Sequence, residues 1–205
     1  MSNHAVIAQL TRHPQISIAR QARQRTGLAT GHAALDRALP EGGWPRGALT
    51  ELLVASPGSG ELRLVLPGLA GLTAGQRWIA LVQPPWVPYP HAWAAAGIDL
   101  QRLLVVRPGD ARSGWWALDQ LLRSGAFGAV LGWPGNLPGP QLRKLQLAAE
   151  TGRACGFLIR SIGAASQHST AALRIHLSRD QQQLRLRLLK CRGRLRGAEL
   201  ALSLH

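Results

Sequence analysis

The segment that most constrains the fold spans residues 47–63, GALTELLVASPGSGELR, and has the frame of a phosphate-binding turn. A hydrophobic run, 49–54, leads into a turn of small residues, 55–60, and an apolar, helix-like segment follows. In the motif G-x-x-x-x-G-K-[ST], backbone N–H groups hold phosphates, the lysine reaches the terminal phosphates and the hydroxyl binds magnesium. The order strand, small-residue turn, helix predicts an α/β protein.

The reactive side chains of that motif are missing. Glu61 stands in place of the lysine and Leu62 in place of the hydroxyl. A carboxylate repels a triphosphate, and leucine cannot bind a hard cation. We therefore expect no cofactor; weak ATP binding by the backbone of residues 56–60 is the alternative. The vestigial turn consists of Ala55, Ser56, Pro57, Gly58, Ser59, Gly60, Glu61 and Leu62.

The charge balance favours a polyanionic partner. The chain has 24 Lys and Arg against 10 Asp and Glu, a formal net charge of +14. This excess suits nucleic acid or an acidic protein face, and the alternative is the arginine-rich composition of a high-GC genome. The 2 cysteines and 7 histidines show no ligand spacing, so we expect no metal. Neither a signal peptide nor a membrane span is recognisable, so we expect a cytoplasmic protein without membrane contact.

Strand-like and helix-like segments alternate after Thr30, which predicts a mainly parallel sheet flanked by helices. Two further alternating segments predict a C-terminal antiparallel hairpin. We expect a basic, partly flexible arm at 1–29, a core domain at 30–190 and a basic tail at 191–205. Strands are expected at 49–54, 77–82, 103–106, 126–131, 156–159, 172–177 and 183–189, and helices at 30–39, 61–72, 90–96, 113–123 (capped by Ser113) and 141–150.

Several motifs occur in the order found in RecA-type recombinases, which the chain resembles over about residues 26–197. They are TGHAALDRAL (30–39), GGWPRGALTEL (42–52), AAGIDLQRLLVV (95–106) and LRSGAF (122–127). This resemblance implies a RecA-like P-loop NTPase core. The phrase LPEGGWPRGALTEL (39–52) is similar to the ImuA family, RecA-like accessory proteins of bacterial mutagenic repair cassettes, and SulA is a shorter relative.

The resemblance implies a non-catalytic role in SOS-induced translesion DNA synthesis. The partners that it implies are an ImuB-like protein, an error-prone polymerase and RecA. Pro85 takes the place of RecA's catalytic glutamate and Trp133 that of its magnesium-supporting aspartate, so we expect no ATPase activity. The alternatives are a SulA-like inhibitor that binds the tubulin-like division protein, and a true ATP-dependent recombinase.

The resemblance also matches Lys190 and Arg192 to the two RecA lysines that reach a neighbour's ATP, which suggests a cap on a RecA protomer. The alternative is that they are ordinary cations. Phosphate contacts through the cationic segment would be weak and non-specific, because no aromatic residues are interleaved. The other candidate cations are Arg185, Arg187, Arg194 and Arg196.

Tryptophans near a proline-rich loop are the candidate protein contacts. We expect Trp86 and Trp93 to be exposed there, since aromatic residues anchor interfaces. The alternative role, filling the core, is expected for Trp78 and for at least one of Trp115 and Trp116. Glu41 and Glu51 are expected to be structural.

Overall fold

The structure is a computed structural model that describes residues 26–180, 183–191 and 197–203. Most of the expected N-terminal arm therefore lies outside the described residues. The same is true of three candidate contact residues, Arg192, Arg194 and Arg196.

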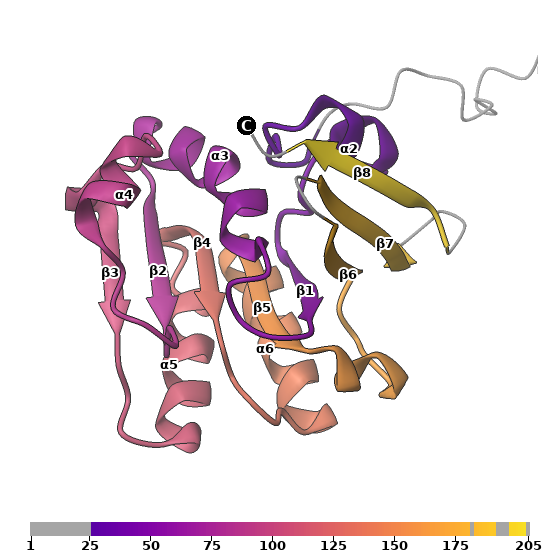
Figure 1. Ribbon diagram of the computed structural model, residues 1–205. Helices are drawn as coiled ribbons and strands as arrows, with labels where there is room; N and C mark the ends of the chain where they lie inside the picture. The colour runs from indigo at the N-terminus through magenta and orange to yellow at the C-terminus, as the bar shows by residue number, and fades with distance from the viewer. Residues whose placement is uncertain (1–25, 181–182, 192–196, 204–205) are drawn as a thin grey trace, which may run out of the picture.

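A single twisted sheet runs through the described part of the chain (Figure 1). Its eight strands have the order β3-β2-β4-β5-β1-β6-β7-β8. The pairs from β3 to β6 are parallel, and β7 and β8 add to β6 in antiparallel fashion. The strands are β1 (Ala48–Val54), β2 (Trp78–Val82), β3 (Leu103–Val106), β4 (Phe127–Gly132), β5 (Cys155–Ser161), β6 (Leu173–Asp180), β7 (Gln183–Cys191) and β8 (Glu199–Ser203).

Helices cover both faces of the sheet. One apolar layer packs against α2, α3 and α4, and it contains the edge-to-face pair Trp44–Phe157, whose ring centroids are 5.2 Å apart. The other layer packs against α5 and α6. The helices are α2 (Ala33–Ala38), α3 (Glu61–Ala74), α4 (Pro90–Ala95), α5 (Ala111–Arg123) and α6 (Gly139–Gly152), with short 3-10 turns at Leu100–Arg102 and Ile162–Ser166. The predicted mainly parallel α/β fold with a C-terminal antiparallel addition is confirmed.

Two local predictions are wrong. The expected basic tail contains β8, which pairs with β7. The cap of α5 is Asp110 rather than Ser113, because the Asp110 carboxylate accepts a hydrogen bond from the Ser113 N–H at 2.8 Å. That same hydrogen bond is the main reason why the pKa of Asp110 is lowered.

A buried ion cluster joins the central strands. Glu51 of β1 is fully buried, and its two carboxylate oxygens accept hydrogen bonds from Arg160 of β5 and Arg174 of β6. Arg174 also donates to the carbonyls of Ala164 and Gln167 in the loop after β5. Glu51 is thus structural, as the sequence predicts.

Replacing Glu51 by alanine should strongly destabilise the fold, because it leaves two guanidinium groups buried without their carboxylate. We expect a loss of about 3–5 kcal/mol in the free energy of unfolding, measured by urea denaturation. The matched control is Glu199→Ala, which removes an exposed pair with Arg187 at 3.7 Å and should cost less than about 1 kcal/mol. Similar losses in both variants would contradict the structural role of the cluster.

Candidate functional site

The turn at residues 55–60 joins the central strand β1 to helix α3. Parallel strands place their carboxyl ends at one edge of a sheet, where ligands of α/β proteins usually bind. The turn needs glycine at two positions, because Gly58 and Gly60 have φ angles of +90° and +107°. The turn therefore has a tight backbone path that depends on glycine.

The Glu61 side chain folds back onto this turn and is buried there. This side chain is 1% exposed, and its Oε1 accepts a hydrogen bond from the Gly58 N–H at 2.7 Å. In a phosphate-binding turn, such N–H groups and the helix N-terminus hold the anion. Here the carboxylate of the first residue of α3 takes one of those donors, and its negative charge lies where the helix dipole favours it.

The neighbouring strand ends carry apolar side chains. Pro85 is exposed in the loop that follows β2. Trp133 follows β4, and its backbone N–H donates to the carbonyl of Val82 at 3.2 Å. Neither side chain carries a carboxylate, so these two strand ends present a proline and an indole ring instead.

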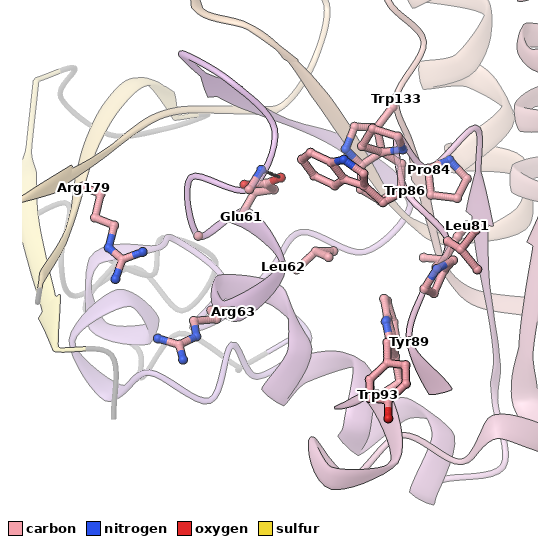
Figure 2. A pocket seen from close by; sticks show the side chains of 15 residues that line it. Glu61, Leu62, Arg63, Leu81, Pro84, Trp86, Tyr89, Trp93, Trp133 and Arg179 are labelled. Carbon is pink, nitrogen blue, oxygen red and sulfur yellow. Dashed lines mark hydrogen bonds between the residues drawn. The ribbon is translucent and has the colours of Figure 1, made fainter. Parts of the chain in front are cut away.

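A pocket of about 320 Å³ lies beside the turn (Figure 2). It is bounded by the turn, by the N-terminus of α3 and by the loop between β2 and α4. Its lining includes Gly58, Glu61, Leu62, Arg63, Pro84, Pro85, Trp86, Tyr89, Trp93, Trp133 and Arg179. Sequence reasoning missed Tyr89, Arg63 and Arg179; Arg179 comes from β6, and no local sequence signal links it to this loop.

The exposure of two tryptophan side chains, Trp93 and Trp78, differs from the prediction. Trp86 is 59% exposed, as expected, but Trp93 is only 6% exposed, so its expected exposure is wrong. Helix α4 directs Trp93 into the core, where it packs with the α3 side of the sheet. Trp78, expected in the core, is 39% exposed and lies beneath the Arg102 guanidinium. Trp115 is partly buried against the α5–α6 layer, which agrees with the expectation for that pair.

The described candidate cations do not gather at the pocket. Lys190 donates from Nζ to the Ser169 carbonyl at 2.8 Å. Arg185 and Arg187 lie on the exposed face of β7, where they pair with Asp180 at 2.6 Å and Glu199 at 3.7 Å. Their roles as phosphate or partner contacts stay predictions.

The described residues contain no cluster of His, Cys, Asp or Glu that could hold a metal ion. Burial raises the pKa of the Cys155 thiol to about 12, so this group stays protonated at neutral pH. Nor does any helix within the described ranges have the length and apolar character needed to cross a bilayer.

Replacing Glu61 by alanine should free the turn for an anion. We expect inorganic phosphate to leave the amide resonance of Gly58 unchanged in the wild-type chain and to shift it in Glu61→Ala, measured by ¹H–¹⁵N NMR. Glu150→Ala, on α6, is the control and should behave like the wild type. A phosphate-induced shift of equal size in the wild type would show that Glu61 does not close the turn.

Comparison with known proteins finds SulA and RecA proteins among the relatives of this chain. The chain is 31% identical over 100 residues to the cell division inhibitor SulA of Edwardsiella piscicida, covering 48% of this chain and 60% of that protein. It is 27% identical over 135 residues to SulA of Yersinia enterocolitica, covering 64% and 80%. It is 30% identical over 104 residues to RecA of Streptomyces venezuelae, covering 51% and 27%.

The match spans less than two thirds of the Edwardsiella SulA and of the Streptomyces RecA. No protein-family model matches the chain. These three relatives do not include an ImuA, so membership of that family stays a prediction.

Proposed function

From its place in the RecA/SulA-related superfamily, we propose that this chain is a non-catalytic accessory protein of SOS-induced, error-prone translesion DNA synthesis. It acts in the cytoplasm by binding an ImuB-like protein, RecA or both, alongside an error-prone polymerase. The observation that carries the proposal is the Glu61 carboxylate, which fills the phosphate-binding turn and hydrogen-bonds Gly58. A scaffold of this kind keeps its shape while its nucleotide chemistry is lost.

The loss of catalysis is supported at several separate positions. Phosphoryl transfer requires a cation on the phosphates, a metal ligand and a group that positions the nucleophile. The chain has Glu61 and Leu62 in the turn, and apolar Pro85 and Trp133 at the strand ends. One of these changes could be compensated by a rearranged side chain, but their combination removes every reactive part.

Binding through protein contacts is supported by the loop beside the turn. Trp86, Val87 and Tyr89 are exposed by 59%, 78% and 65%, although each is large and apolar. Contiguous exposed apolar groups are a feature of interaction sites. The loop lies at the strand edge where an ATPase would hold its nucleotide, which supports the proposal that this edge serves as a contact surface.

A second candidate is a SulA-like cell-division inhibitor that binds the tubulin-like division protein. The alignments with the two SulA proteins favour it, because one of them extends over 80% of its relative. The GGWPRG phrase of this chain (42–47) favours the accessory role instead. A weak, non-specific DNA contact through Arg185 and Arg187 is compatible with either.

The proposal predicts that the purified chain neither binds nor hydrolyses ATP. We expect no magnesium-dependent binding of a fluorescent ATP analogue and no phosphate release, because the turn lacks a cation and a metal ligand. RecA with its own substrate DNA serves as the positive control. Micromolar, magnesium-dependent affinity with turnover would restore the recombinase alternative.

The partner is identified by parallel pull-downs with the ImuB-like protein, RecA and the division protein from the same bacterium. We expect capture of the ImuB-like protein or RecA, and a loss of at least tenfold in affinity in Trp86→Ala, which removes an exposed anchor. Trp116→Ala is the matched control, since Trp116 is 63% exposed on α5 and lies outside the pocket lining. Capture of the division protein alone would favour the SulA-like role.

A further inference from the structure

Two buried polar atoms of the pocket lack a hydrogen-bond partner among the described residues. They are Oε2 of Glu61, an acceptor, and Nε1 of Trp133, a donor. Both side chains line the same cavity. Buried polar groups in folded proteins are almost always paired with protein or with ordered water. An unpaired acceptor and an unpaired donor that line one pocket are therefore compatible with a site that a bound group completes.

The guest that satisfies both atoms must offer a donor and an acceptor together. A peptide group does so, with its N–H towards Glu61 and its C=O towards Trp133. A cation is not required, because Glu61 begins helix α3 and the helix N-terminus already favours its negative charge. A neutral amide therefore fits the charge that the site presents.

The walls of the pocket suit apolar side chains. Trp86 lies close over the turn, since a Cβ atom placed on Gly58 would be 3.4 Å from its ring. Tyr89 and Trp93 line the same space, together with several prolines. Aromatic-lined pockets with a few polar groups are typical of peptide and ligand recognition.

The rim carries positive charge. Arg63 of α3 and Arg179 of β6 line the pocket and are exposed. Figure 2 shows them on the opposite side of Glu61 from the rings of Trp86 and Trp133. A carboxylate on the guest would pair with the Arg63 guanidinium while the apolar part lies among the rings.

A nucleotide fits the pocket less well. Its base could stack on Trp86, but its phosphate would then approach the buried carboxylate of Glu61, which repels it. A peptide has no obligatory negative charge at that position, so it can approach Glu61 with an N–H group.

We propose that this pocket binds a short apolar segment of a partner protein that carries an acidic residue beside its apolar side chains. A backbone amide of the segment pairs with Oε2 of Glu61 and Nε1 of Trp133, and the exposed Trp86 ring turns to pack against the apolar side chains of the segment. The acidic side chain pairs with Arg63. This inference rests on the proposed function only in that the chain acts through protein contacts, and it assigns the surface and the chemistry of the contact.

The test selects short random peptides displayed on phage against the immobilised full-length chain. We expect the selected peptides to combine apolar and acidic residues. In NMR titrations the synthesised peptides should shift the Trp133 indole N–H resonance, which is assigned with Trp133→Phe. We expect affinity to fall at least tenfold in Glu61→Ala and in Trp86→Ala, and several-fold in Arg63→Ala.

Trp116→Ala is the matched control and should bind within twofold of the wild type. Circular dichroism of every variant checks that the fold is kept. Selection of no peptide, or equal binding by wild type, Glu61→Ala and Trp86→Ala, would overturn the inference. The pocket would be assigned to nucleotides instead if ATP or a thymidine oligonucleotide displaced the peptide and shifted the Trp133 indole resonance more than the peptide does.

The two proposals fail separately. If the selected peptides require Glu61 and Trp86 while neither the ImuB-like protein nor RecA is captured, the pocket stands and the accessory role is wrong. If one of those proteins is captured with equal affinity by the wild type and Trp86→Ala, the accessory role stands and this pocket is not its contact surface.

Discussion

The ion cluster around Glu51 holds together the part of the sheet on which the site depends. One carboxylate on the central strand β1 accepts hydrogen bonds from Arg160 and Arg174, which belong to the strands on its two sides. Breaking such a cluster leaves charges without counter-ions in a medium of low polarity, so the three strands are constrained together. The ion pairs of Glu51 with Arg160 and Arg174 thus hold in place strand β1, from whose carboxyl end the turn at 55–60 begins.

Glu61 supplies a hydrogen-bond acceptor for a backbone N–H group of the turn. A helix N-terminus has N–H groups without intrahelical acceptors, and a tight glycine turn adds further inward-facing donors. In a nucleotide-binding protein the phosphates accept these hydrogen bonds. Here Oε1 of Glu61 accepts one from Gly58 within the same chain. The substitution that removes the motif's lysine therefore also supplies an internal acceptor, and one residue accounts for both effects.

The sequence predicted the parallel strands well because their apolar runs and small-residue turns are local signals. Strand β3 was predicted with the observed bounds, Leu103–Val106. Strand β8 was missed because its alternation of polar and apolar residues is short and follows a run of cations that is typical of a basic tail. The cap of α5 was misassigned because Asp110 and Ser113 are both good cap residues, and their mutual hydrogen bond decides between them.

The candidate site was only partly predictable, for a different reason. The missing lysine and hydroxyl are visible at Glu61 and Leu62, but the hydrogen bond from Gly58 depends on how the Glu61 side chain folds back. The burial of Trp93 depends on which side of α4 faces the sheet, and the short PHAWAA segment has too few residues to define that side. Arg179 lines the pocket because β6 lies beside β1 in the sheet. The order of strands in a sheet cannot be read from local sequence patterns.

Gly60 shows that a motif glycine can have a structural role that is separate from ligand binding. Its φ of +107° disfavours any side chain, and a Cβ atom there would lie 3.0 Å from the Leu184 side chain of β7. The backbone conformation thus favours glycine here, and the Leu184 side chain would have to shift to accommodate any other residue. The glycines of this turn therefore do not by themselves indicate ATP binding in a sequence survey; the residue after the second glycine, lysine in the motif and Glu61 here, is the more informative position.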